Sequence, residues 1–225
     1  MLNVVAPDVW EISRPMKAPG LRAGHRMTVV RVGPEDLWIH SPVAWDIALD
    51  EALENLGAAR YFVAPSRYHD LYWLDWFQNF SGSTFSCAPG VKEEHAHLPF
   101  QRVLTDGAAD PWEPQLQKVF IAGMPKVNEF VFFHPASRSL IVADLVFNFS
   151  RDQNLLGKLF LMVNDAYGRV AISRLFRSCI KDREAFKQSM QRILEWDFER
   201  IIMGHGAIVE RDGKQVLRKA LAWLT

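Results

Sequence analysis

The stretch IIMGHG, residues Ile201 to Gly206, ends an apolar run with one histidine held between two glycines. Three consecutive apolar residues are typical of a buried strand. Glycine allows backbone angles and close contacts that other residues resist, so Gly-His-Gly is suited to aiming a single imidazole. The alternative is a strand-to-loop turn whose histidine faces water, and these six residues alone favour that alternative. The partners of His205 must therefore be sought elsewhere in the chain.

Two other apolar runs also end in polar residues. RYFVAP (Arg60 to Pro65) is followed by SRYHD (Ser66 to Asp70), and SLIVAD ends at Asp144. The carboxyl ends of strands in layered α/β proteins converge on one rim, where ligands bind. We therefore expect two imidazoles and two carboxylates to meet there, a ligand set that suits zinc, iron or manganese. The four predicted ligands are His69, Asp70, Asp144 and His205. Each of them alone could instead be an ordinary turn or first-turn helix residue.

The order of the predicted elements favours a mixed α/β architecture. Up to about residue 149 the chain contains short apolar or alternating runs separated by turns, with two helical patterns between them. After residue 154 the pattern becomes mainly helical, around one further strand at residues 199–204. The predicted helices cover residues 46–56, 69–80, 155–166, 170–179, 182–194 and 214–224. We find no internal repeat and no linker, so we expect one α+β or layered α/β domain over residues 1–225.

The overall composition gives expectations about partners and location. Lys plus Arg and Asp plus Glu number 26 each, so the chain as a whole has no charge that would attract nucleic acid or an anionic membrane. The two cysteines, Cys87 and Cys179, are far apart, and we expect reduced thiols in a cytoplasmic protein. The first residues lack the pattern of a signal peptide.

The most apolar segment is LLGKLFLMV, from Leu155 to Val163. It contains Lys158 and is shorter than the roughly 20 residues that span a bilayer. The favoured interpretation is a core helix. The alternatives are a cover over the predicted cleft or a homodimer face, the latter being the one protein partner that we expect.

Taken together, these motifs resemble the metallo-β-lactamase-like fold. They are strand–loop–helix at residues 61–78, strand–turn–strand ending in Asp144, and strand–Gly-His-Gly near the C-terminus. The resemblance implies a four-layer αββα sandwich with metals bound at one edge. The family hallmarks are HxHxDH, a histidine in a GHT-like turn, GDxxF and a late GHG; here VADLVF stands for GDxxF and MGHG for the last. Within the fold the chain is most similar to a branch described only as domain of unknown function 4336, which implies no established reaction.

The sequence departs from the family at the first two motifs. HxHxDH becomes PSRYHD over residues 65–70, and the GHT-like turn corresponds to GMPKVNE at residues 123–129, which has no histidine. In the family the three missing histidines hold one metal, while the Asp-His pair and the late histidine hold the other. The resemblance thus implies one remaining site, with His69, Asp70, Asp144 and His205 as its ligands. The cofactor would be one divalent metal (Zn, Fe or Mn), or none if the site has decayed.

Arg67 stands where the family has a metal-binding histidine. Its fixed charge could replace the lost cation beside Asp144 or Glu129, because guanidinium and carboxylate groups pair in a bidentate manner. Arg67 and Glu129 are accordingly predicted to contact the substrate or ligand. A solvated loop residue is the alternative for Arg67.

The sequence leaves two functions open. The first is a single-metal hydrolase of esters, thioesters or lactones, in which Asp144 completes the metal shell or orients the attacking water. The second is a metal-free, inactive member in which Arg67 replaces the metal and the cleft binds a small molecule or a protein. Iron-based redox chemistry of the flavodiiron kind is a third alternative, although those relatives have a fuller ligand set and a flavin partner.

The remaining histidines receive other interpretations. His95 and His97 are predicted to lie on the surface, and His25 in a loop among basic residues. His40 and His134 each end an apolar run and could line the same rim.

Overall fold

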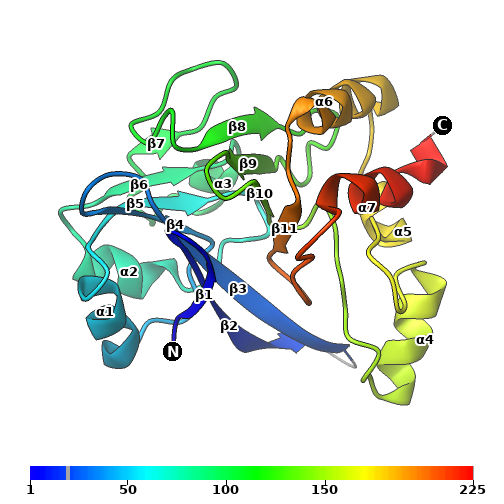
Figure 1. Cartoon of the computed structure of the whole chain (residues 1–225), viewed down its shortest axis with the longest axis horizontal. Coiled ribbons are helices and arrows are strands. Elements are labelled where there is room, and N and C mark those ends of the chain that lie inside the picture. Colours follow the sequence, from blue (N-terminus) through cyan, green and yellow to red (C-terminus); the bar gives the residue numbers. More distant parts are fainter. Residues whose placement is uncertain (19–20, 225) are drawn as a thin grey trace.

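Two β-sheets lie against each other, with helices on their outer sides (Figure 1). This is a computed structural model, and it describes residues 1–18 and 21–224. The first sheet has its strands in sequence order: β1 (Asn3–Ala6), β2 (Val9–Ala18), β3 (Leu21–Arg31), β4 (Asp36–His40), β5 (Ala58–Ala64), β6 (Thr84–Cys87) and β7 (Arg102–Val103). The second sheet has the order β11 (Arg200–Met203), β10 (Ser139–Val142), β9 (Phe130–His134) and β8 (Gln117–Phe120).

Both sheets are mixed, and each contains parallel neighbours. In the first sheet β4, β5, β6 and β7 run parallel, whereas β1 to β4 form antiparallel pairs. In the second sheet β10 runs parallel to β11 and antiparallel to β9. Parallel neighbours end at the same edge, so loops after β4 and β5, and after β10 and β11, can deliver side chains to common sites.

Helices form the outer layers of the sandwich. The helices are α1 (Ile47–Glu54), α2 (Trp73–Asn79), α3 (Val91–Glu94), α4 (Leu155–Val163), α5 (Arg174–Arg177), α6 (Arg183–Glu195) and α7 (Gly213–Ala220), followed by the 3₁₀ turn η1 (Ala222–Leu224). Helices α1 and α2 lie beside the first sheet, and α6 and α7 beside the second (Figure 1). The predicted αββα arrangement is confirmed.

The two central strands of the second sheet, β9 and β10, are largely apolar because both of their faces are buried. Phe132 packs into the core that also contains β2 to β6, α1 and α2. Its neighbours Val131 and Phe133 point the other way, into the core beneath α6 and α7. Successive side chains of a strand alternate between faces, so a strand with two buried faces reads as a continuous apolar run.

The two sheets are joined by backbone contacts between β3 and the end of β11. The Arg26 backbone N–H donates to the carbonyl of Gly204 at 2.9 Å, and the Arg26 guanidinium donates to the carbonyl of Met203 at 2.6 Å. Arg26 also pairs with buried Glu11 at 2.9 Å, which balances its charge. The basic residue next to His25 is therefore part of the core connection.

Several sequence-based element boundaries are wrong. The second predicted helix after residue 154 is reduced to α5, and the first ends at Val163. His25, which was predicted to lie in a loop, is within β3 and is buried. Strand β3 is longer than the apolar run MTVVRV because it pairs residue by residue with β2 from Leu21 onward.

Helix α4 is not a core helix, which corrects the favoured interpretation of LLGKLFLMV. Only Gly157 and Leu161 are buried, and most of its large apolar side chains face outward. None of the helices in the described part of the chain combines the length and apolarity needed to cross a bilayer.

The cap of α6 gives a first testable prediction. Asp182 was predicted to start this helix, and its carboxylate accepts a hydrogen bond from the Ala185 N–H at 2.9 Å. We expect Asp182→Ala to lower the free energy of unfolding by about 1 kcal/mol, because the N–H loses its acceptor. Urea denaturation measures the change.

The matched controls for this change are Asp182→Asn and Lys187→Ala. Asparagine keeps an acceptor oxygen at the cap, and Lys187 is an exposed residue of the same helix. Both variants should stay close to wild type. An unchanged midpoint for Asp182→Ala would contradict the assigned role.

Candidate metal centre

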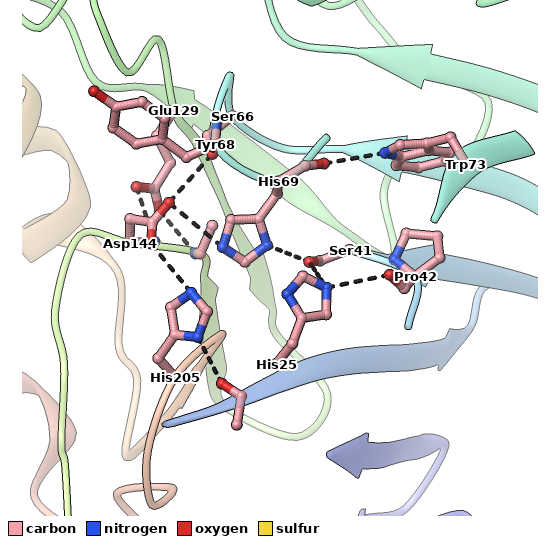
Figure 2. Close-up of polar contacts among 12 residues, drawn as sticks. His25, Ser41, Pro42, Ser66, Tyr68, His69, Trp73, Glu129, Asp144 and His205 are labelled. Atoms are coloured by element: carbon pink, nitrogen blue, oxygen red, sulfur yellow. Dashed lines mark hydrogen bonds and ion pairs between the residues drawn. The ribbon is translucent and has the colours of Figure 1, made fainter. Parts of the chain in front are cut away.

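Three imidazoles from distant segments meet at the edge where the parallel strands end (Figure 2). His25 comes from β3, His69 from the loop after β5, and His205 from the loop after β11. One ring nitrogen of each lies within 4.8 Å of the others, and all three side chains are buried. The ring centroids are 4.9 Å apart for His25 and His69 and 5.2 Å apart for His69 and His205. One strand and the loops after two others thus contribute to a single cluster.

Each imidazole has one nitrogen against a protein oxygen. His25 Nε2 lies 3.1 Å from the carbonyl of Pro42, and His205 Nδ1 lies 2.6 Å from the carbonyl of Gly24. A carbonyl oxygen only accepts hydrogen bonds, so these two nitrogens carry the proton. The other nitrogen of each ring, His25 Nδ1 or His205 Nε2, therefore carries the lone pair that can bind a metal. His69 Nδ1 contacts the hydroxyl of Ser41, which also lies 3.1 Å from His25 Nε2. Outer contacts of this kind orient histidine ligands in metal sites.

Asp144 faces two of the three rings. Its Oδ2 lies 3.4 Å from His69 Nε2, and its Oδ1 lies 3.4 Å from His205 Nε2. These separations are long for hydrogen bonds but equal the spacing of about 3.4 Å between ligands on a tetrahedral ion with bonds of about 2.1 Å. Ser66 donates to Asp144 Oδ2 at 3.3 Å. The residues present therefore fit one divalent metal held by nitrogen and oxygen.

Glu129 lies directly behind Asp144 and fixes its backbone. Its carboxyl group accepts hydrogen bonds from the N–H of Ala143 at 2.8 Å and of Asp144 at 3.1 Å. Burial and the nearby charge of Asp144 raise the pKa of Glu129 to about 8, against the opposing effect of these N–H donors. A protonated Glu129 leaves Asp144 as the one charged carboxylate of this pair at neutral pH. Glu129 is thus a supporting group, and its side chain is buried.

Burial and the neighbouring charges set the protonation states of His25, Asp144 and His205. Burial and the neighbouring rings of His69 and His205 lower the pKa of His25 to about 3, so this imidazole is neutral at physiological pH. Burial would raise the pKa of Asp144, but His69 and His205 outweigh it and hold that pKa well below its usual range. Burial likewise works to lower the pKa of His205, and the contact with Asp144 reverses the net direction upward. Asp144 and His25 are therefore in the forms that metals require, whereas a metal at His205 would have to displace the proton that the contact with Asp144 favours.

The two glycines around His205 have different physical roles. A Cβ at Gly204 would lie 2.7 Å from Cε1 of His69 and 2.8 Å from the carbonyl oxygen of Ala143. Gly206 has a φ of +93°, and a Cβ there would lie 2.2 Å from the carbonyl of Asn148. The first glycine lets another imidazole approach, and the second lets the chain turn. The interpretation that the two glycines orient the imidazole of His205 therefore has a structural basis.

The structure brings together three of the four ligands predicted from the sequence. His69, Asp144 and His205 lie in the cluster. Asp70 does not, because its carboxylate turns outward and pairs with His95 at 2.8 Å. His95 itself is partly exposed, and it was predicted to lie on the surface.

Arg67 is not beside Asp144 or Glu129 as was expected. Its guanidinium forms an ion pair with Glu94 and donates to the carbonyl of Pro125 at 2.6 Å. The pKa of Arg67 is raised by the hydrogen bond to Glu94. Arg67 therefore pairs with Glu94 on α3, and not with Asp144 or Glu129, the partners expected from the sequence.

His25 and Ser41 belong to the cluster but were not predicted from the sequence. A period-two signal was present for His25, since in LRAGHRMTVVR it shares a strand face with Met27 and Val29, both fully buried. The flanking arginines concealed it. Ser41 follows β4 with a φ of +55°, a turn conformation that had no sequence signal.

His40 and His134 do not join the cluster. His40 is buried against the rings of Trp38 and Phe132, at centroid distances of 5.5 and 5.8 Å. His134 pairs with Ser139 at the opposite end of β10.

Comparison with known families and structures supports the fold. A family model described as "Domain of unknown function (DUF4336)" matches residues 8–159. A search of curated proteins gave no match.

Among solved structures, a metallo-β-lactamase from Pontibacter korlensis has a TM-score of 0.65 at 14% identity, with 98% of each chain covered. A metallo-β-lactamase from Hirschia baltica has a TM-score of 0.67 at 13% identity, covering 100% of this chain and 96% of that one. The metal-soaked Flv1 flavodiiron core from Synechocystis has a TM-score of 0.68 at 9% identity, covering 100% of this chain and 60% of that one. At these identities the matches establish a metallo-β-lactamase-like fold, not a reaction.

The contact at Gly204 leads to a second prediction. We expect Gly204→Ala to lower the free energy of unfolding by about 1–3 kcal/mol, because the new methyl group must displace the buried His69 ring or the backbone at Ala143. Thermal and urea denaturation measure the loss.

Gly82→Ala is the matched control, since a Cβ there meets no atom within 4 Å. Its stability should stay within about 0.5 kcal/mol of wild type. Equal effects of the two substitutions would show that the close approach at Gly204 is not the cause.

Proposed function

The chain belongs to the DUF4336 family, and on that premise we propose that it binds one divalent metal through His25, His69 and His205, with Asp144 as an additional ligand. The observation that carries the proposal is the arrangement of the imidazoles. Two have their protonated nitrogen on a backbone carbonyl, the third contacts a hydroxyl, and the remaining nitrogens lie close together beside one carboxylate. If this cluster held no metal, buried ring nitrogens would be left without polar partners, which is rare in native proteins.

The ligand set differs from the one that the sequence motifs implied. His25 from the first sheet takes a place that Asp70 was expected to fill. The proposal of a metal-free protein with Arg67 in place of the ion loses its support, because the guanidinium is paired with Glu94.

We further propose that the metal-loaded protein hydrolyses small esters, thioesters or lactones. A bound divalent metal supplies Lewis acidity and lowers the pKa of water in the site toward about 7. In this proposal the carboxylate of Asp144 completes the metal shell or orients that water, and Glu129 keeps the Asp144 backbone fixed. Tyr72 is 38% exposed, and its ring lies edge-on to His25 at a centroid distance of 5.9 Å. In this proposal it lines the path by which a substrate reaches the cluster. This proposal rests on the fold likeness and on the site together.

A third prediction tests the ligand set. Protein stripped with a chelator is titrated with zinc or manganese by isothermal calorimetry, and we expect one ion per chain. His25→Ala should weaken binding at least about tenfold, because a ligand is lost. Circular dichroism checks that the variant is folded.

Asp70→Asn and His97→Ala are the controls. Both residues lie outside the cluster, so both variants should bind as wild type does. No binding to the wild-type protein, or an equal loss in Asp70→Asn, would refute the proposed ligand set.

A fourth prediction concerns catalysis. Metal-loaded protein is assayed against a panel of chromogenic esters, thioesters and lactones. Asp144→Asn should lower kcat/KM at least about 100-fold, because the neutral amide loses the negative charge that would hold the metal and orient the attacking water. Chelation should abolish turnover, and added metal should restore it.

Absence of turnover with full metal occupancy would refute the hydrolase and leave the metal site standing. The protein would then be a metal-dependent binding module.

A further inference from the structure

Helix α4 presents a wide apolar surface to solvent. Six of its nine residues are large apolar side chains that are between 46% and 82% exposed. They are Leu155, Leu156, Leu159, Phe160, Met162 and Val163. Single exposed apolar residues are common on protein surfaces, but six on one short helix are not. Such a surface indicates an interaction site.

The helix is held firmly despite this exposure. Asn154 caps it by accepting from the Gly157 N–H at 2.7 Å, and Leu161 packs with Phe149, Ala166 and Ala171. Leu175 of α5, 61% exposed, extends the apolar surface, since its N–H donates to Asn164 just beyond the end of α4. The helix protrudes at one corner of the molecule (Figure 1). We call Leu175 and the six exposed residues of α4 the α4 surface.

The charges around the α4 surface are strongly unbalanced. Helix α4 contains no acidic residue, and its one charged residue is Lys158. The segments that flank α4 are residues 150–154 and 164–177. Five arginines lie on these segments or contact them: Arg22, Arg151, Arg169, Arg174 and Arg177.

The two acidic residues of these segments are already paired. Asp152 binds Arg22, and Asp165 binds both Arg169 and Arg177. Six cations against two carboxylates give a local charge of +4, in a chain whose formal net charge is zero. The whole-chain balance thus conceals a basic region around the most exposed apolar helix.

We propose that the α4 surface docks on an anionic lipid bilayer. A helix with a broad apolar side and basic neighbours lies in the membrane interface, with its apolar side chains among the acyl chains and its cations at the headgroups. A second copy is a poorer occupant, since a twofold contact would bring two basic rims together. Nine residues also span only about 13 Å, which is small for the roughly 800 Å² per partner of a stable dimer. The docking is peripheral and is independent of any metal in the site.

The test is sedimentation of the full chain with vesicles. Vesicles of equal parts phosphatidylcholine and phosphatidylglycerol should bring the protein down at low salt, and phosphatidylcholine vesicles alone should do so weakly. Raising the salt concentration should release it, because screening weakens the contribution of the cations.

The variant Leu156→Ser/Leu159→Ser should bind at least about tenfold more weakly, as it loses two side chains that insert into the interface. Ile47→Ser/Leu74→Ser is the matched control. Ile47 and Leu74 are 66% and 56% exposed on α1 and α2, on the opposite side of the molecule (Figure 1), and this variant should bind as wild type does. Hydrogen exchange of the wild-type protein provides a readout that needs no variant, because the amides of α4 should become more protected when anionic vesicles are added.

Three results would overturn the proposal. The first is no sedimentation of wild-type protein with anionic vesicles at low salt, and the second is equal binding by the two double variants. The third is a dimer in analytical ultracentrifugation that Leu156→Ser/Leu159→Ser dissociates, which would assign the α4 surface to a second copy. Each result is obtained on metal-free protein, so failure of the metal site would not affect it.

Discussion

The parallel pairing of β10 with β11 is the constraint on which the candidate site depends. Val142 lies opposite Met203 at the end of this pair, so Asp144 and His205 each lie two residues beyond the last paired position. The same end of β11 is bonded to β3 through Arg26, and His205 itself donates to the carbonyl of Gly24. His25 lies between these two contact points on β3. One strand register and one connection between the sheets therefore place three of the four proposed ligands.

Burial then sets the chemistry of the cluster. An imidazole at the surface would exchange protons freely near neutral pH, but the depressed pKa of His25 keeps it neutral and able to coordinate. Asp144 stays charged in the same buried region because two imidazoles face its two oxygens. Burial and the charge of Asp144 raise the pKa of Glu129, which favours its protonated form. Two buried carboxyl groups thus take different states from different neighbours, as is common in functional sites.

The α4 surface illustrates a different use of the same fold. The αββα core is complete without the exposed side of α4, which touches the rest of the protein through Leu161 and Gly157. The aromatic rings of Phe147 and Phe149 stack beneath it, and Phe147 also stacks over His205 at 6.0 Å. The exposed helix and the candidate metal centre are therefore neighbours connected by packed rings. Physical proximity of this kind would bring the site close to whatever surface α4 contacts.

The sequence by itself determined the mixed α/β class and the polar residues at the ends of three strands, because apolar periodicity and glycine placement are local properties of the chain. It placed His69, Asp144 and His205 at strand ends, and the resemblance of the motifs gave the sandwich. Only the tertiary structure decided which side chains face inward. Asp70 and Arg67 turn away because His95 and Glu94, remote in sequence, lie within reach of them. His25 turns inward, and the apolar residues of α4 turn outward, because a residue's surroundings depend on which other segments pack against its strand or helix.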